Sequence, residues 1–256
     1  MSSGAIVVYA GPSLPAGMRP ADPLFRWEPP ASAGDALRLL DRPPRAVCLI
    51  DGFFDHRPAP WHKELMLLAS RGVALFGAAS MGALRAAELG PSIMTGVGSI
   101  HRAYRDGLLT GDDEVACVHA PGELGWAPLT VPMVEVRATL LAARRARLVD
   151  RATARTARSL AHDIYFADRD WPAIERAWAG LLSPETVATI RMLHVPLKRM
   201  DAQACLARAL RCTTAPSPAP DPPRTCYLDK LIEEAGSAIT SAATSVNPAS
   251  EAGGRG

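Results

Sequence analysis

One stretch, residues 72–89, constrains the fold of this chain more than any other. A short apolar run, 73–76, is followed by a series of mostly small residues, 77–82, and then by an Ala- and Leu-rich segment with helical spacing. A strand that turns sharply into a helix needs small residues at the turn, because bulky side chains would collide there. The sequence therefore predicts a strand, a tight turn and a helix, with Ser80 at the turn.

This turn has two interpretations. The frame Ala78-x-Ser80-x-Gly82 has the form of a nucleophile elbow, with Ala in place of the first Gly. Such a turn also places free backbone N–H groups at a helix start, an arrangement that suits an anion. The alternative is a tight turn in which Ser80 only caps the following helix.

Apolar runs alternate with helical patterns through the first half of the chain. The runs 6–10, 46–50, 73–76 and 115–118 are expected to be buried strands, and the Pro-rich segment 15–30 is expected to be a loop. Strands separated by helices indicate an α/β fold. We expect a Rossmann-like parallel sheet with helices on both of its faces.

The second half of the chain changes character. We expect an α/β core over 1–130 and a helical lobe over 131–212, where helical patterns follow one another. Residues 213–256 are rich in Pro, Ser and Ala, a composition that predicts a largely disordered tail.

Composition excludes several classes of protein. A hydrophobic content of 48% supports a globular core, and a net charge of only +2 argues against a nucleic-acid-binding protein. No apolar run is long enough to cross a membrane, and the N-terminus leads directly into a predicted strand rather than a signal peptide. Five scattered cysteines without a C-x-x-C pair fit reduced thiols and give no zinc signature. These features lead us to expect a cytoplasmic protein without a metal.

Four polar residues follow the four predicted strands: Ser13, Asp51, Ser80 and His119. In an open parallel sheet, ligands bind outside the carboxyl ends of the strands. The four side chains are therefore candidates for one ligand site. For Asp51, which precedes a glycine, the alternative is an ordinary turn residue.

Further candidates lie between and beyond these strands. His62 stands near a predicted helix start, Arg85 and Glu88 share one face of the helix after Ser80, and Asp112 and Asp113 belong to an acidic cluster. The alternative for His62 is a solvated histidine, and the alternative for Arg85 and Glu88 is a surface ion pair. For Asp112 and Asp113 the alternative is the cap of a turn. Dinucleotide, P-loop and zincin motifs are absent from the sequence.

Several segments, taken together and in this order, resemble the TfuA-like family, the accessory partners of YcaO proteins. They are Asp51-Gly52-Phe53-Phe54, Trp61-His62-Lys63-Glu64, Gly77 to Leu89, Gly96-Val97-Gly98, Tyr104 to Gly107, Asp112 to Ala116, His119 and Val131 to Val134. The resemblance spans 6–142, and Leu197 to Ala202 extend it more weakly into the helical lobe.

The resemblance implies a function. TfuA-like proteins act with YcaO enzymes, cyclodehydratases that use ATP to activate a peptide amide for backbone thioamidation, as in the biosynthesis of modified peptides (RiPPs). The TfuA partner recruits a ubiquitin-like sulfur carrier and hydrolyses its C-terminal thiocarboxylate, which delivers sulfide. By this resemblance the chain is a sulfur-transfer hydrolase without a cofactor of its own, and it meets the precursor peptide only indirectly.

The predicted site suits this chemistry in two ways. Ser80 is either the nucleophile, with the N–H groups of Met81 and Gly82 near the oxyanion, or a ligand of the thiocarboxylate while water attacks. The segment from Gly96 to Gly98 would let the carrier tail approach the backbone closely.

A base and a cation complete the expected site. His62 or His119 is the expected base, with Asp51 as the residue that orients it. Lys63 or Arg85 is expected to hold the negative thiocarboxylate.

Two competing functions stay open at the level of sequence. In the first, the protein is a non-catalytic adaptor of YcaO that binds the carrier tail or a nucleotide. In the second, it is an independent serine hydrolase, although no Asp is clearly placed between Ser80 and His119 to complete a triad in the usual order.

Overall fold

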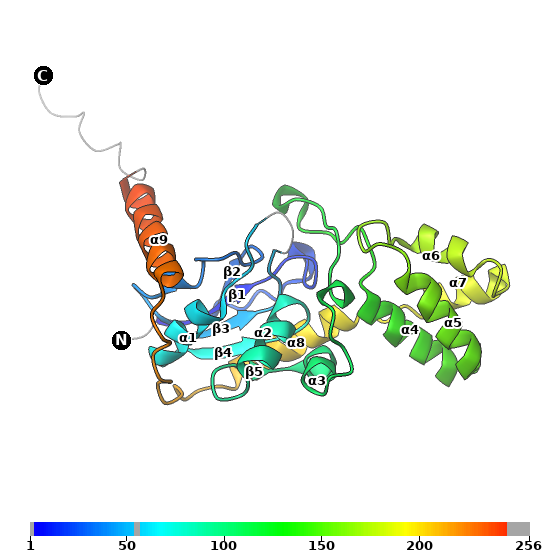
Figure 1. Cartoon of the computed structure of the whole chain (residues 1–256), viewed down its shortest axis with the longest axis horizontal. Helices are drawn as coiled ribbons and strands as arrows, with labels where there is room; N and C mark the ends of the chain where they lie inside the picture. Colours follow the sequence, from blue (N-terminus) through cyan, green and yellow to red (C-terminus); the bar gives the residue numbers. More distant parts are fainter. Residues whose placement is uncertain (1–2, 54–56, 245–256) are drawn as a thin grey trace, which may run out of the picture.

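The computed structural model describes residues 3–53 and 57–244 (Figure 1). Its centre is a five-stranded parallel sheet in the order β2-β1-β3-β4-β5. The strands are β1 (Ser3–Tyr9), β2 (Phe25–Glu28), β3 (Pro44–Leu49), β4 (Ala74–Gly77) and β5 (Thr95–Gly96). Phe54 of the family motif and the tail residues 245–256 lie outside the described residues.

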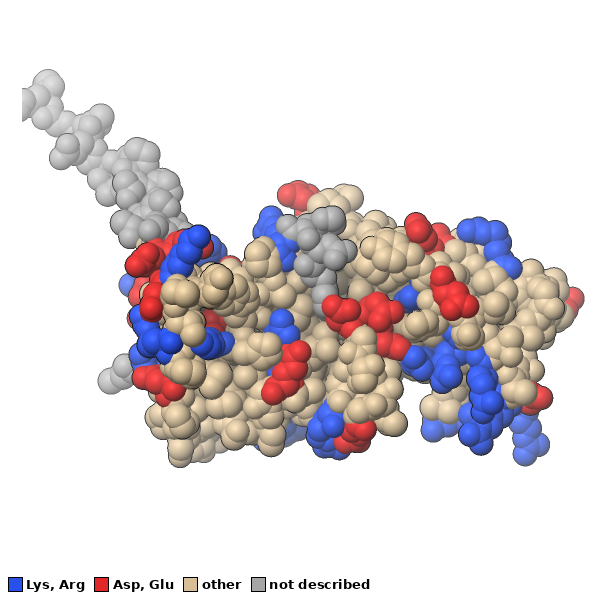
Figure 2. Space-filling model, viewed as in Figure 1, with Lys and Arg blue, Asp and Glu red and all other residues tan. Residues whose placement is uncertain are grey.

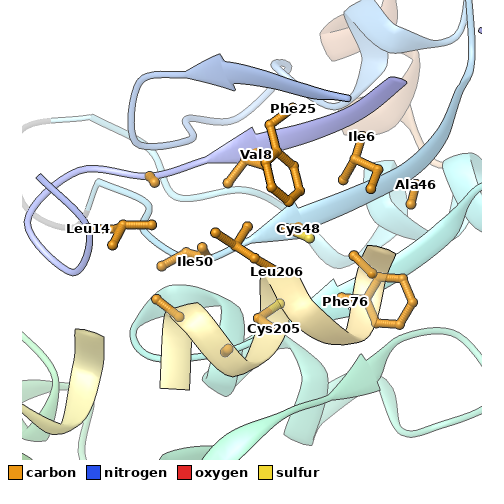
Figure 3. Packing of buried hydrophobic residues seen from close by; sticks show 14 of the residues in the cluster. Ile6, Val8, Leu14, Phe25, Ala46, Cys48, Ile50, Phe76, Cys205 and Leu206 are labelled. Carbon is orange, nitrogen blue, oxygen red and sulfur yellow. The ribbon is translucent and has the colours of Figure 1, made fainter. Parts of the chain in front are cut away.

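Helices cover both faces of the sheet. They include α1 (His62–Ser70), α2 (Met81–Leu89), α3 (Gly98–Arg105) and α8 (Leu197–Leu210), together with the short 3-10 helix η2 (Leu37–Leu39). On one face, α8 packs Cys205 and Leu206 against Cys48 and Phe76 (Figure 3). The other face is covered by α1, α2 and η2. The predicted Rossmann-like α/β core is confirmed.

Two strands were not expected from the sequence. β2 lies inside the Pro-rich segment, where prolines flank four residues that pair with β1 at the sheet edge. A strand at an edge tolerates neighbouring prolines, because half of its backbone groups need no partner strand. β5 has only two residues, too few to show any periodic pattern.

The expected strand over 115–118 is wrong. Val115 ends the short helix over Asp112–Glu114 in a helical conformation, and 116–118 join no strand of the described structure, since their backbone groups bind elsewhere. The Val118 N–H donates to Thr130 Oγ1, and the Val118 carbonyl accepts from the Leu129 and Thr130 N–H groups. Val115 is fully buried beneath α2 and α3. His119 therefore follows a loop segment that crosses the sheet edge, not a strand.

Glycines let α2 lie unusually close to the sheet. A Cβ atom on Gly82 would stand 1.7 Å from the Leu49 carbonyl oxygen, and one on Gly77 would stand 2.1 Å from the Gly82 carbonyl oxygen. No side chain fits in either space. The small residues of the turn are thus required by the contact between β3, β4 and α2.

The start of α3 depends on a second close contact. Asp201 on α8 accepts hydrogen bonds from the Ser99 and Ile100 N–H groups, at 2.9 and 2.8 Å. A Cβ atom on Gly98, which has φ +96°, would stand 2.2 Å from the Asp201 carboxyl carbon, and one on Gly96 would overlap the His101 ring. Gly98 thereby lets α8 cap α3, and Gly96 leaves room for the His101 ring of α3.

The remaining helices form a lobe beside the sheet (Figure 1). They are α4 (Met133–Arg145), α5 (Arg151–His162), α6 (Trp171–Trp178) and α7 (Pro184–Met192), and they share a hydrophobic cluster around the fully buried Trp178. α8 starts at this lobe and runs under the sheet. The expected lobe, 131–212, includes α8, and in the structure this helix also packs against the core sheet.

The structure differs from the expected disordered tail over α9 (Cys226–Thr244). Leu228 is fully buried against Leu37 and Leu67, so an apolar face anchors the start of this helix. The composition of this segment does not reveal that face. Ala and Leu favour a helix, whereas the many Ser and Thr residues around them favour a loop. Within the described part of the chain, no helix is long and apolar enough to span a membrane.

Glu64 on α1 makes stability depend on pH. Its carboxylate is buried and accepts hydrogen bonds from the N–H groups of Trp61, Gly34 and Ala36. Burial raises the pKa of Glu64 from 4.5 to about 7, against the opposing effect of these hydrogen bonds. The folded pKa lies above the unfolded one, so the stabilisation is complete below the unfolded pKa and is lost as pH rises through about 7.

We therefore expect the free energy of unfolding to fall by about 3 kcal/mol on account of this group between about pH 4.5 and about pH 8. Urea titrations of the wild type and of Glu64→Gln across this range measure it. The Gln variant is expected to be less stable at low pH, because its amide N–H₂ faces backbone donors, but to lack this part of the pH slope. An equal slope in both proteins would contradict the prediction.

Candidate functional site

A cavity of about 170 Å³ opens at the carboxyl ends of the central strands. Its wall includes Asp51 after β3, Ser80 after β4, the segment around Cys117 and His119, and Lys198 from α8. Three of the four predicted residues therefore share one cavity. Ser13 lies just behind it, bound to Asp51.

Asp51 organises the loop after β1. Its Oδ2 accepts hydrogen bonds from the Gly11 and Ser13 N–H groups at 2.8 and 3.0 Å, and its Oδ1 accepts from the Ser13 hydroxyl at 2.6 Å. The carboxylate is almost fully buried, and Lys198 Nζ lies 4.0 Å from Oδ1. Asp51 thus orders a loop and balances a buried cation, and its carboxylate makes no hydrogen bond to His119.

Lys198 is a candidate site residue that sequence reasoning missed. Its ammonium donates to the Val115 carbonyl at 2.8 Å and to Cys117 Sγ at 3.7 Å. Burial by itself would lower the pKa of Lys198, but Cys117, Asp51 and Glu135 outweigh burial and hold its pKa above the usual value. The raised pKa favours the ammonium form of Lys198 at the cavity wall. The weak family resemblance over 197–202 was the one sequence signal.

Cys117 is a poor nucleophile in this setting. Burial raises the pKa of its thiol, and the neighbouring Lys198 opposes that rise only in part. The nucleophilic form of cysteine is the thiolate, so a raised pKa lowers the reactivity of this thiol. Cys117 contributes packing and a soft acceptor for the ammonium.

Ser80 occupies the position before α2 but does not cap it. Its side chain makes no capping hydrogen bond; the hydroxyl instead points to the Val115 carbonyl at 3.5 Å, the same oxygen that Lys198 binds. Ala79, directly before it, has φ +66°, which is a strained conformation for a residue with a Cβ atom. The turn holds the hydroxyl beside the ammonium at the cavity wall.

The backbone donors of this turn are only partly available. The N–H groups of Ser80 and Gly82 both donate to the Ile50 carbonyl at 3.3 Å. The Met81 N–H, by contrast, has no acceptor among the described residues. The predicted pair of oxyanion donors is thereby reduced to one, and neither Met81 nor Gly82 lines the cavity.

His119 presents one ring nitrogen as a base. Its Nδ1 lies 2.9 Å from the Ala120 carbonyl, which can only accept, so in the neutral ring Nδ1 carries the proton. Nε2 then has a free lone pair. Edge contact with Trp126 at 5.3 Å between ring centroids, and a tilted contact with Phe53 at 6.2 Å, hold the imidazole in place.

Other predicted site residues gather on the outer surface of α1 and α2. His62 Nε2 lies 2.8 Å from Glu88 Oε2, and Arg85 pairs with the same carboxylate at 2.6 Å. Arg85 also donates to the Pro60 carbonyl, and Lys63 donates to Thr225 Oγ1. None of these four side chains lines the cavity.

The remaining candidates lie elsewhere in the fold. Gly96 and Gly98 serve the packing of α3 and α8 described above, and neither lines the cavity. Asp112 and Asp113 lie on the short helix η3 (Asp112–Glu114), where Asp113 stands 3.8 Å from His162 Nε2. Over residues 3–53 and 57–244, no group of three or more His, Cys, Asp or Glu side chains is placed to hold a metal ion.

A second cavity of about 270 Å³ lies beside the first. The two share Pro12, Cys117 and Lys198 as a common wall. On its far side Glu135 pairs with His194 at 3.0 Å. The Lys198 side chain therefore lies in the wall that the two cavities share.

Comparison with known protein families gives a match to the middle of the chain. Residues 51–170 match the family model described as TfuA-like protein. No curated protein matches the chain. The matched segment contains Asp51, Ser80, Cys117 and His119 and ends before α8. Residues 51–170, slightly less than half of the chain, are therefore similar to the TfuA-like family.

Proposed function

We propose that this protein binds the C-terminal thiocarboxylate of a ubiquitin-like sulfur carrier in the cavity beside Ser80 and hydrolyses it. The sulfide released there supplies a YcaO partner that thioamidates a peptide with ATP. Similarity to the TfuA-like family supports the general role in YcaO-associated chemistry. The hydrolytic step is our proposal, and it rests on the residues of the cavity.

One observation carries the proposal: a lysine side chain is buried in the wall of a small cavity. Lys198 is 2% exposed, and it reaches the wall that holds Ser80 and His119. A buried cation attracts an anion far more strongly than a solvated one, because the local dielectric constant is low. A thiocarboxylate at the end of a slender peptide tail has the charge and the size for this space.

The chemistry follows from the same residues. His119 Nε2 takes a proton from water, and the water oxygen attacks the thiocarboxylate carbon. The developing negative charge is stabilised by the Lys198 ammonium and the Ser80 hydroxyl, which both lie in the cavity wall. The C–S bond then breaks, His119 returns the proton to sulfur, and the products are a carboxylate and hydrogen sulfide.

Within this scheme Ser80 is a ligand and water is the nucleophile. The Ser80 hydroxyl points to a backbone carbonyl, and no base touches it in the structure. The protonated state of Lys198 also excludes it as a general base for Ser80. The hydroxyl is suited to donate a hydrogen bond to the bound thiocarboxylate.

The test is sulfide release from thiocarboxylated carrier by this protein alone, without YcaO. We expect Ser80→Ala to slow release by about tenfold, since it removes one neutral hydrogen bond. His119→Gln is expected to slow release by a factor of 10² or more, on the order that a general base contributes. Ser70→Ala is the matched control, because its hydroxyl also donates to a backbone carbonyl but lies on α1.

Two outcomes would change the assignment. Complete loss of release in Ser80→Ala, with a trapped acyl-enzyme in the wild type, would make Ser80 the nucleophile. Tight carrier binding without any sulfide release would instead support the adaptor function. That second result would refute hydrolysis by this chain while leaving the binding cavity in place.

A further inference from the structure

The helical lobe carries a groove of about 380 Å³ between α4 and α5. Five arginines line it, Arg137 and Arg144 from α4 and Arg151, Arg155 and Arg158 from α5. Figure 2 shows the corresponding concentration of Lys and Arg side chains over this end of the molecule. The groove shares no lining residue with the cavity beside Ser80.

Helical spacing explains why these side chains converge. Arg137 and Arg144 are seven residues apart, and Arg151, Arg155 and Arg158 follow the i, i+4, i+7 pattern, so each set lies on one helical face. A short connection, 146–150, joins the two helices, which pack side by side. Two arginine rows therefore run along the two walls of one groove.

These charges are largely unpaired. Arg137 forms a two-pronged ion pair with Glu114, which neutralises one end of the groove. The other four arginines make no ion pair with any carboxylate in the described ranges. Four like charges held side by side repel one another, so the surface favours an anionic partner.

The floor of the groove is apolar. Leu140 and Ala154 are buried there, and Leu141 is 44% exposed between the arginine rows. Among the residues that the structure describes, no aromatic ring lines the groove, so a nucleic-acid base would have no ring there to stack on. Carboxylates beside an apolar stripe match the surface better than a phosphate backbone does.

We propose that this α4–α5 arginine groove docks an acidic amphipathic helix of a partner protein. The carboxylates of that helix pair with Arg144, Arg151, Arg155 and Arg158, because the guanidinium fork binds carboxylates with two parallel hydrogen bonds. Its apolar stripe lies on Leu141. A helix laid into a groove between two others is a common mode of recognition. The proposal does not depend on the chemistry at Ser80.

The experiment uses the full chain and a fluorescent, stapled helical peptide built of Glu-Leu-Leu-Glu repeats, with binding read by anisotropy. We expect saturable binding that weakens when salt rises from about 0.1 to about 1 M, since the Debye length shrinks from about 10 to about 3 Å. The double variant Arg144→Glu/Arg155→Glu is expected to bind at least about tenfold more weakly. Leu141→Ser is expected to weaken binding by a smaller factor.

Matched controls separate the groove from overall charge. Arg102→Glu/Arg211→Glu makes the same change in net charge at two exposed arginines outside the groove, and we expect it to bind the peptide as the wild type does. Circular dichroism and thermal melts of each variant establish that it is folded. Replacing Glu by Gln, or Leu by Ser, in the peptide removes the charge or the apolar stripe separately and is expected to weaken binding in each case.

Several results would overturn the proposal. Equal loss of binding in both double variants would mean attraction by net charge rather than by the groove. If the peptide without Leu binds as tightly as the original peptide, Leu141 does not contact an apolar stripe of the partner helix. A single-stranded oligonucleotide that binds more tightly than the acidic peptide, and loses binding in Arg144→Glu/Arg155→Glu, would make the groove a nucleic-acid surface.

Discussion

Replacing Lys198 by Met is expected to abolish most sulfide release from thiocarboxylated carrier. The change keeps the aliphatic length of the side chain but removes the buried charge beside the cavity. Loss of one preorganised stabiliser of a developing negative charge costs on the order of 10² to 10³ in kcat. Single-turnover measurement of sulfide, with the carrier in excess of its Kd, reports this step directly.

Two further lysine variants sharpen this experiment. Lys230→Met is the matched control, because Lys230 is exposed on α9 and pairs only with Glu234. Lys63→Met examines the expectation from sequence that Lys63 holds the thiocarboxylate. Full activity in folded Lys198→Met together with loss of activity in Lys63→Met would move the anion site to the α1–α2 surface and contradict our proposal.

Replacing Gly82 by Ala is expected to destabilise the protein by more than about 3 kcal/mol. The added Cβ atom would stand 1.7 Å from the Leu49 carbonyl oxygen, and a backbone oxygen within a central strand cannot turn aside as a side chain does. Overpacking in a core costs about 1–3 kcal/mol even where side chains can shift. Here α2 must move away from β3, which also displaces Ser80.

Urea and thermal unfolding measure this effect. Gly180→Ala is the control, because nothing lies within 4 Å of the added Cβ atom at that position. We expect that variant to be within about 0.5 kcal/mol of the wild type, as for most surface substitutions. A Gly82→Ala protein as stable as Gly180→Ala would show that α2 is free to shift and would refute the packing requirement.

The sequence predicts the core well because its signals are local. The apolar runs that become β1, β3 and β4 lie between helical patterns, and the small residues from Gly77 to Gly82 mark the sharp turn into α2. The alternation alone implies parallel strands, since parallel neighbours require crossover connections. Asp51, Ser80 and His119 could be assigned to one edge of the sheet on the same grounds.

The strand assigned to 115–118 shows where local signals fail. Its β-branched and apolar residues fit a strand, but its hydrogen bonds go to Thr130 and Lys198, partners distant in sequence. Burial of Val115 explains the apolar pattern equally well. An apolar pattern indicates that a segment is buried, but it does not indicate which groups form hydrogen bonds with the backbone of that segment.

Lys198 could not be assigned to the site for a related reason. It belongs to a helical pattern, 83 residues after Val115, and a lysine on a helix is most often solvated. Only the packing of α8 across the sheet brings its ammonium to the cavity. The expected boundary between core and lobe concealed this contact, because α8 was counted with the lobe.

The position of α8 has a consequence for synthesis on the ribosome. The sheet face that bears Val8, Cys48 and Phe76 is covered by α8, which emerges after all five strands and the four lobe helices. At about 5–20 residues per second, that face stays exposed for several seconds, and exposed apolar surface favours aggregation. Asp51 likewise lacks its buried counter-ion, Lys198, until α8 has been synthesised. The nascent chain therefore completes its core and its candidate site in a single late step.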